Sequence, residues 1–285
     1  MIRFDSDYTE GCHPRVLDAL VRTNMEQTPG YGLDGHCERA RALIRSACAA
    51  PEADVHFLVG GTQTNATVIA AALRPWQGVL SPDTGHINCH ETGAIEAGGH
   101  KVLTLPHDNG KITAEQLRRA IDALRADGNY EHIVQPGMVY ISQPTEYGTL
   151  YAKAELEAIS AVCRERDLPL MLDGARLAYA LAADETLTLA DYARCCDVFT
   201  VGGTKCGLLF GEAVVITRQS LKPDFRNIIK QRGCSACSMR QCLKTGSTSN
   251  ADVAALTRRG ASAARCSRAG WTLRSTRRRT RFSCC

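Results

Sequence analysis

The sequence predicts an α/β fold in which a mostly parallel sheet is covered by helices. Short, nearly continuous apolar segments alternate with amphipathic helical segments through residues 1–233. Apolar strands of this kind are typical of parallel sheets that are buried on both faces. Several of these segments end in glycine-rich turns, where a strand can pass into a helix. A chain of 285 residues that is 44% hydrophobic can form one sizeable domain and a smaller part.

The first expected elements are two helices and a strand. Pro14 opens an amphipathic helix, a second helix spans residues 35–49, and a strand covers residues 55–59 and turns into a third helix. Further short strands are expected near residues 78–81, 101–105, 138–142, 168–173, 198–201 and 213–217. Helices are expected between most of them, near residues 86–97, 113–126, 153–166 and 188–195.

A lysine and an aspartate follow two of the apolar strands. Lys205 stands in a glycine-rich turn after residues 198–201, and Asp173 ends the strand at 168–173. In an open α/β sheet, the carboxyl ends of parallel strands face one crevice, so these two side chains are expected to meet. A poorly solvated lysine is a good nucleophile, and a carboxylate can keep a pyridine nitrogen protonated. The pair is what pyridoxal 5′-phosphate (PLP) requires. Each residue alone also fits an ordinary turn or surface position, but their order along the chain favours the cofactor.

Gly60-Gly61-Thr62 follows a strand and opens a helix. Free backbone N–H groups at a helix N-terminus, together with the helix dipole, form an anion site that suits the cofactor phosphate. No Lys-Ser/Thr pair follows, so this is not a P-loop, and the spacing of a dinucleotide fingerprint is absent. The same three residues also serve as a plain turn and helix cap.

His86 and His90 are four residues apart, which places both on one face of the expected helix. One interpretation is that His86 covers the cofactor ring as an aromatic plate and His90 carries protons nearby. A metal pair with Glu91 as base is disfavoured because the order differs from His-Glu-x-x-His, and no metal site is expected. For His90, a structural role in a cap or in the core is nearly as good an interpretation.

Composition argues against several partners and locations. No apolar run is long enough to span a bilayer, and residues 1–7 lack the hydrophobic core of a signal peptide. We therefore expect a cytoplasmic protein without membrane association. The 14 cysteines follow no small-domain disulfide spacing and are expected to be mostly buried thiols. The basic run at 277–279 has no interleaved aromatic residues, so nucleic-acid binding is not expected.

Together these motifs resemble the low-specificity threonine aldolases, which belong to the β-eliminating lyases of PLP-dependent fold type I. The similarity covers roughly residues 1–233. The motifs that carry it are Phe4-Asp5-Ser6-Asp7, Tyr31-Gly32, Gly60-Gly61-Thr62, His86 with Glu91-Thr92-Gly93-Ala94, Asp173-Gly174-Ala175-Arg176 and Thr204-Lys205.

The resemblance implies how the cofactor is held. Lys205 would bind PLP covalently, and Asp173 would pair with the pyridinium nitrogen. His86 would stack on the ring, and the backbone of Gly61 and Thr62 would hold the phosphate. These roles are what the family implies for the matching positions of this sequence.

The resemblance also implies the substrate contacts and the reaction. Arg176 would lie by the ring hydroxyl or the substrate carboxylate, Ser6 would help to bind that carboxylate, and Tyr31 would lie near the site or at a subunit boundary. The family's reaction is the reversible retro-aldol cleavage of a β-hydroxy-α-amino acid, L-threonine to glycine and acetaldehyde, by a homo-oligomer (dimer or tetramer). The alternatives are a β-eliminating PLP lyase that acts on another amino acid, and an inactive, truncated remnant of such an enzyme.

Two departures from the family's pattern stand out. Many members carry a histidine in the segment that here spans residues 142–147, so the general base is open, with His90 as a candidate. After residue 233, the segment 234–285 has eleven Lys and Arg residues but a single acid, and it lacks Glu, Ile, Tyr, His and Pro. We expect a PLP-binding large domain at 1–233, followed by a basic tail that has too few apolar residues to fold alone. The family's small C-terminal domain would then be missing or replaced, for example through a frameshift.

Overall fold

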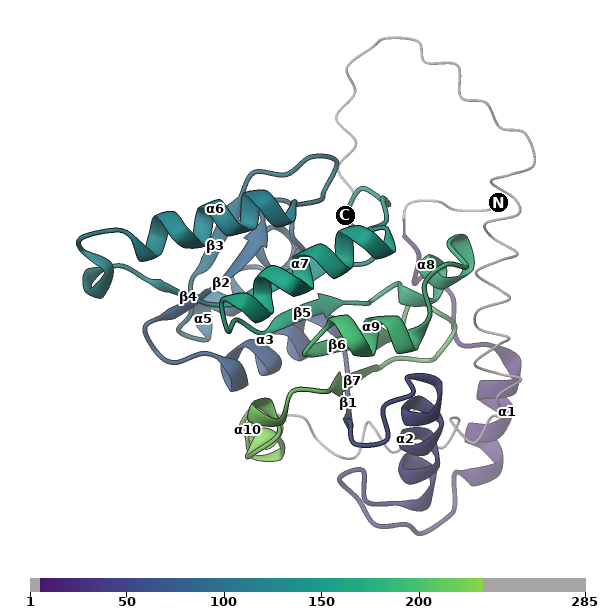
Figure 1. Ribbon diagram of the computed structural model, residues 1–285. Helices are drawn as coiled ribbons and strands as arrows, with labels where there is room; N and C mark the ends of the chain where they lie inside the picture. The colour runs from purple at the N-terminus through teal and green to yellow at the C-terminus, as the bar shows by residue number, and fades with distance from the viewer. Residues whose placement is uncertain (1–5, 233–285) are drawn as a thin grey trace, which may run out of the picture.

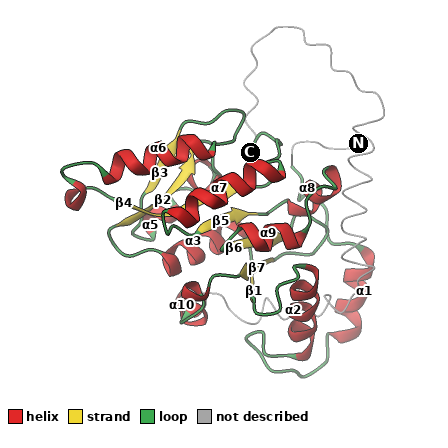
Figure 2. Ribbon diagram, in the orientation of Figure 1, coloured by secondary structure: helices red, strands yellow, loops and turns green. Residues whose placement is uncertain are grey.

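The computed structural model describes residues 6–232, so the expected tail at 234–285 lies outside the described residues. The described chain forms a layered α/β unit in which a central sheet lies between groups of helices (Figures 1 and 2). No helix within 6–232 is long and apolar enough to cross a membrane.

The sheet has seven strands in the order β1-β7-β6-β5-β4-β2-β3. Strand β7 is antiparallel to its neighbours β1 and β6, and the other pairs are parallel. This confirms the expected α/β fold with a mostly parallel sheet. The strand bounds are β1 (Asp54–Leu58), β2 (Gln77–Pro82), β3 (Val102–Leu105), β4 (Gln135–Ser142), β5 (Leu170–Asp173), β6 (Val198–Gly202) and β7 (Glu212–Ile216).

Most helices lie where the sequence predicts them. On one side, α6 packs against α7, and α7 against α9; elsewhere α3 contacts α5 and α10. The strands at the centre of the sheet are apolar because both faces are covered: Val139, Leu172 and Phe199 are fully buried. The helix bounds are α1 (Pro14–Thr23), α2 (Gly35–Ala47), α3 (Gly61–Ala72), α6 (Ala114–Arg125), α7 (Lys153–Glu165), α8 (Leu177–Ala183), α9 (Leu189–Cys195) and α10 (Phe225–Gln231). Neither α8 nor α10 was expected from the sequence.

The expected helix at 86–97 is wrong as a single element. It is two short helices, α4 (His86–Cys89) and α5 (Ala94–Ala97). Thr92 has φ 52° and Gly93 φ 69°, and such left-handed backbone cannot continue a right-handed helix. His86 and His90 therefore do not share the face of a continuous helix, because His90 caps the C-terminus of α4.

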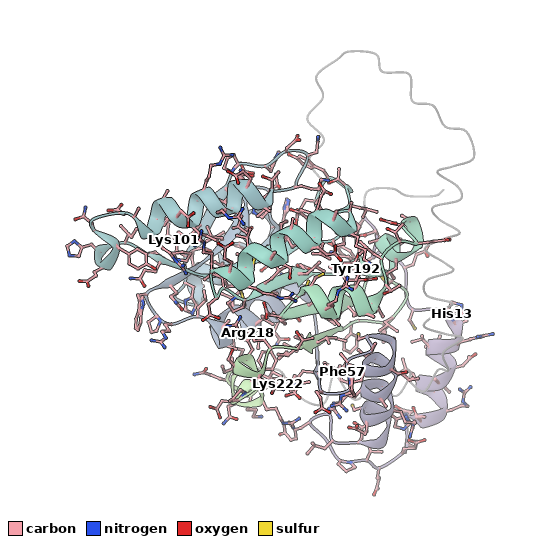
Figure 3. All side chains as sticks on the ribbon, viewed as in Figure 1. His13, Phe57, Lys101, Tyr192, Arg218 and Lys222 are labelled. Carbon is pink, nitrogen blue, oxygen red and sulfur yellow. The ribbon has the colours of Figure 1, made fainter. Side chains whose placement is uncertain are left out.

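The loop after β4 is held by side chains from distant segments. Gln143 Nε2 donates a hydrogen bond to the hydroxyl of Tyr192 on α9, over 3.1 Å (Tyr192 is labelled in Figure 3). Gln143 also donates to the Tyr151 carbonyl and accepts from the Tyr151 N–H. These contacts anchor the segment that leads from β4 into the candidate site.

Candidate active site

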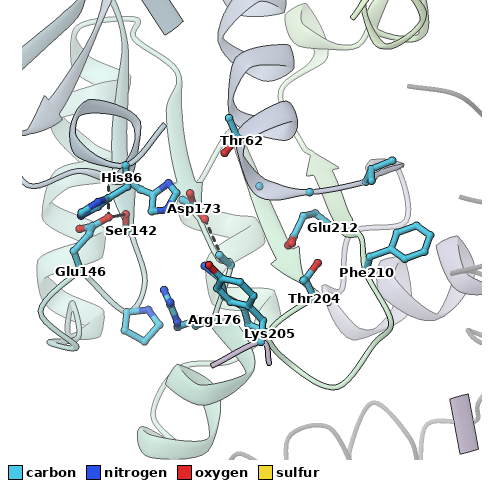
Figure 4. Close-up of a pocket in the computed structure, with 17 residues that line it drawn as sticks. Thr62, His86, Ser142, Glu146, Asp173, Arg176, Thr204, Lys205, Phe210 and Glu212 are labelled. Carbon is cyan, nitrogen blue, oxygen red and sulfur yellow. Dashed lines mark hydrogen bonds between the residues drawn. The ribbon is translucent and has the colours of Figure 1, made fainter. Parts of the chain in front are cut away.

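A cavity of about 340 Å³ opens where β4, β5 and β6 end. Its position follows from strand direction, because parallel strands present their carboxyl ends at one edge of the sheet. The sequence-predicted residues that line it are Gly61, Thr62, His86, His90, Asp173, Arg176 and Lys205 (Figure 4).

Two predicted substrate residues do not line this cavity. Tyr31 is 56% exposed, and the Nζ atom of Lys230 lies 5.0 Å from its ring centroid. Ser6 is outside the lining, and its hydroxyl is buried without a hydrogen-bond partner among residues 6–232. Their roles toward the substrate remain predictions.

Close backbone packing brings the ends of β5 and β6 together. Gly202 N–H donates to the Gly174 carbonyl over 2.9 Å. A Cβ atom at Gly202 would lie 2.1 Å from the Ala175 carbonyl oxygen, and one at Gly174 would lie 2.0 Å from that of Thr200. Only glycine fits at both positions, so the Asp173 and Lys205 turns can lie side by side.

Asp173 is buried, and its carboxylate is oriented by three donors. Oδ2 accepts hydrogen bonds from Asn65 Nδ2 (2.9 Å) and from the hydroxyl of Tyr140 (2.8 Å). Oδ1 accepts from the Ala175 N–H, also over 2.9 Å. Burial raises the pKa of Tyr140 well above its usual value, and the Asp173 charge adds to this, so the phenol remains a donor.

Lys205 projects into the same cavity beside residues that the sequence analysis did not single out. Its Nζ atom lies 5.8 Å from the ring centroid of Tyr8, and its backbone carbonyl accepts from the Tyr179 hydroxyl over 2.9 Å. Glu212, at the start of β7, is another wall residue and is 6% exposed. Burial raises the pKa of Glu212 to about 8, with the Asp173 charge adding and the Lys205 charge opposing.

The N-terminus of α3 forms another part of the wall. The first turn of a helix leaves N–H groups without intrahelical acceptors, and Gly60 provides no side-chain cap. A Cβ atom added at Gly60 or Gly61 would meet nothing within 4 Å. The helix start is therefore open toward the cavity and can receive an anion.

His86 is linked to Asp173 through two buried side chains. Its Nδ1 donates to Glu91 Oε1 over 2.8 Å, and Asn65 Nδ2 donates to that same oxygen over 2.8 Å. The hydrogen bond to Glu91 raises the pKa of His86, burial opposes the change, and the Asp173 and Glu91 charges add to it. The His90 ring lies 5.6 Å from the His86 ring, tilted by 49°.

Arg176 reaches the cavity from the turn after β5 and is paired with Asp7. Its Nε and Nη2 donate to the two carboxylate oxygens of Asp7, the second over 3.1 Å. Burial by itself lowers the pKa of Arg176, but the hydrogen bond to Asp7 and the Asp7 charge outweigh it and raise that pKa. The predicted carboxylate-binding arginine is thus already held by an acid from the N-terminal segment.

The end of β4 adds Ser142 to the cavity wall, and the loop that follows it adds Glu146. Sequence reasoning noted this segment only for its lack of a histidine. The signal that could have found Glu146 was its position, because the segment follows a buried strand that ends at the same edge as β5 and β6.

The residues of the cavity fit PLP. A buried, oriented carboxylate (Asp173) suits a pyridinium nitrogen, a lysine amine (Lys205) faces the same space, and the open glycine turn before α3 can hold a phosphate. Glu91 Oε2 and Asn65 Oδ1 are buried polar atoms without a hydrogen-bond partner among the described residues. Burial without a partner is costly, and both atoms belong to side chains that hydrogen-bond the wall residues Asp173 and His86.

Comparison with known proteins agrees with this geometry. The family model described as beta-eliminating lyase matches residues 4–278. A low specificity L-threonine aldolase from a Pseudomonas species is 34% identical over 245 residues, which cover 84% of this chain and 68% of that protein. The values for the Pseudomonas aeruginosa protein of that name are the same.

Solved structures give a consistent result. A threonine aldolase from Leishmania major superposes with a TM-score of 0.86 at 46% identity, over 92% of this chain and 76% of that one. An aspartate aminotransferase from Thermus thermophilus, at 18% identity and a TM-score of 0.69 over 91% of this chain and 68% of that one, shares the fold alone. The matched length and the identity to these relatives show that the chain belongs to the beta-eliminating lyase family.

Proposed function

We propose that this protein is a PLP-dependent lyase that cleaves L-threonine, and related β-hydroxy-α-amino acids, to glycine and an aldehyde. The observation that carries the proposal is that Asp173 and Lys205 line one cavity with His86 and the open N-terminus of α3. The resemblance to proteins named threonine aldolase favours carbon–carbon cleavage over β-elimination.

Each wall residue has a task in this reaction. When bound, PLP supplies an electron sink for the charge that develops at Cα as the Cα–Cβ bond breaks. Asp173 holds a proton at the ring nitrogen, and Lys205 binds the cofactor covalently. The backbone N–H groups of Gly61 and Thr62 bind the phosphate. His86 packs over the ring and shares its Nδ1 proton with Glu91.

The substrate needs an anchor and a base. Arg176 binds the substrate carboxylate from the cavity wall, and Ser6 assists from the N-terminal segment. The β-hydroxyl must lose its proton, and His90 and Glu146 are the two wall residues suited to take it.

An assay of the purified 285-residue chain tests the proposal. Threonine should release acetaldehyde and glycine, and His86→Ala should lower the rate while His132→Ala, at an exposed position, should not. If serine gives pyruvate and ammonia while threonine gives no acetaldehyde, the protein is a β-eliminating lyase instead. If neither substrate reacts although PLP binds, the chain is an inactive remnant.

We also propose that the protein is a cytoplasmic homo-oligomer, a dimer or tetramer. Apolar side chains on and after α1 are exposed, namely Leu17 (53%), Val21 (70%) and Met25 (87%), and a second copy could cover them. Sedimentation equilibrium should give a mass of two or four chains, and Val21→Glu should shift it toward one. A monomeric parent protein would refute this assembly.

A further inference from the structure

Glu146 is held on the cavity wall by two donors that meet one of its oxygens. Oε1 accepts from the backbone N–H of His86 over 2.9 Å and from the Ser142 hydroxyl over 2.7 Å. The other oxygen, Oε2, takes part in neither of these two hydrogen bonds. Figure 4 shows the carboxylate beside His86 and Ser142. One oxygen is therefore fixed by the protein, and the other remains available to a ligand.

This carboxylate belongs to the same hydrogen-bond network as Asp173. The Ser142 hydroxyl lies 3.3 Å from the Tyr140 hydroxyl, which donates to Asp173. Glu146 is thus oriented by Ser142 at the end of β4 and by His86 at the start of α4. A group whose position is fixed before the substrate arrives is suited to proton transfer.

His90, the other candidate base, is less well held. It is exposed at the C-terminus of α4. Its ring contacts the His86 ring at 5.6 Å, and it has no hydrogen bond from its side chain to another residue in 6–232. No partner selects the tautomer of its ring, whereas Glu146 has two donors that direct its carboxylate.

We propose that Glu146, rather than His90, is the residue that takes the β-hydroxyl proton of the substrate, an inference that rests on the proposed function. In the cleavage direction, the substrate O–H bond breaks and its proton passes to Glu146 Oε2. The oxygen electron pair forms the aldehyde C=O bond as the Cα–Cβ bond breaks, and the pair from that bond remains on the Cα side. A proton then adds to Cα to give glycine, and Glu146 releases its own proton to solvent or to that carbon.

The surroundings of Glu146 suit this role. Burial raises its pKa, and the Asp173 charge adds to this, while the bonds from Ser142 and His86 oppose it. The other titratable groups that line the same cavity are Tyr8, His86, His90, Arg176, Lys205 and Glu212, and the buried Tyr140 remains neutral. A base whose pKa moves toward the working pH transfers protons more efficiently than an ordinary carboxylate.

Glu146→Gln in the full chain tests the proposal, because glutamine can keep the oxygen that faces Ser142 and His86. We expect kcat/KM for threonine to fall by about 100-fold or more. Exchange of the glycine Cα hydrogen with D₂O should continue, because glycine has no hydroxyl, and the affinity for PLP should be unchanged. Glu131→Gln, an exposed carboxylate, is the matched control and should resemble the parent protein.

A second readout does not depend on turnover. Infrared titration of the cofactor-free protein should show two carboxyl groups that protonate above the usual range, Glu146 and Glu212, and Glu146→Gln should lack one of them. In the parent enzyme, kcat/KM should fall at low pH as Glu146 becomes protonated. In Glu146→Gln, the pH profile of kcat/KM should lack this decrease.

Each result has a distinct meaning. If Glu146→Gln cleaves threonine within about 3-fold of the parent and His90→Gln loses about 100-fold, His90 is the base and the inference is wrong. If Glu146→Gln also loses PLP affinity or glycine exchange, Glu146 has only a structural role, which equally overturns it. If the parent protein itself releases no acetaldehyde, the proposed function fails first.

Discussion

The side-chain amide of Asn65 donates to Asp173 Oδ2 over 2.9 Å, so helix α3 directs the carboxylate that ends β5. The same amide donates to Glu91 Oε1 over 2.8 Å. One buried amide therefore lies between two carboxylates. Without it, both would lose a donor in a region that water does not reach freely.

We expect Asn65→Ala to destabilise the protein and to weaken cofactor binding. Loss of hydrogen bonds to charged groups typically lowers the free energy of unfolding by about 1.5–3 kcal/mol each. Denaturant unfolding measures this change, and fluorescence titration with PLP measures the affinity. Asn129→Ala, at an exposed position, is the control. An unchanged stability would show that the amide is not needed to separate the carboxylates.

Lys205→Ala should abolish covalent attachment of PLP. The amine is the nucleophilic side chain of the cavity, and alanine cannot replace it. Visible absorption of the purified protein and mass spectrometry after borohydride reduction measure the attachment. Lys101→Ala, an exposed lysine, should keep both signals. A reducible adduct that persists in Lys205→Ala would assign the role to another residue.

Arg176→Ala should weaken substrate binding. A charge-assisted hydrogen bond is worth about 1.5–3 kcal/mol, which corresponds to about a 10- to 150-fold loss in kcat/KM for threonine. Steady-state kinetics should show the loss mainly in KM. Arg194→Ala removes an exposed surface ion pair with Glu157 and should have little effect. Equal kinetics for both variants would place the substrate carboxylate elsewhere.

Glu91→Gln should make the stability of the protein less dependent on pH near neutrality. The hydrogen bond to Glu91 raises the pKa of His86 in the folded state. A raised histidine pKa adds stability that is complete below the unfolded value of about 6.5 and is lost as the pH rises through the folded value. The difference in unfolding free energy between parent and variant should thus be larger at about pH 6 than at about pH 9. A constant difference would contradict the coupling.

Glu212→Gln should stabilise the protein at alkaline pH. Burial raises the pKa of this carboxyl to about 8. The folded state then holds a proton that the unfolded state has lost, so stability falls as the pH rises from the unfolded pKa toward 8. Each pKa unit of difference between the folded and unfolded states corresponds to about 1.4 kcal/mol in the free energy of unfolding. Unfolding at about pH 5 should give similar values for both proteins, and at about pH 8.5 the variant should be more stable.

The sequence by itself determined the architecture and the two central residues of the site. Apolar periodicity predicts buried strands, and the rule that parallel strands end at one edge places Asp173 and Lys205 in one crevice. The anion site at Gly61 and Thr62 is also predicted from the sequence, because a turn from a strand into a helix exposes the free N–H groups of the helix N-terminus. These features depend on local pattern and chain direction, which the sequence contains.

Only the tertiary structure decided which side chains surround that pair. Asn65, Glu91 and Glu146 reach the network from segments that local pattern does not connect, and their pairing depends on how helices pack on the sheet. The break between α4 and α5 likewise depends on the left-handed backbone at Thr92 and Gly93. Burial and long-range contacts set these hydrogen bonds and pKa values, and neither is a property of a local run of residues.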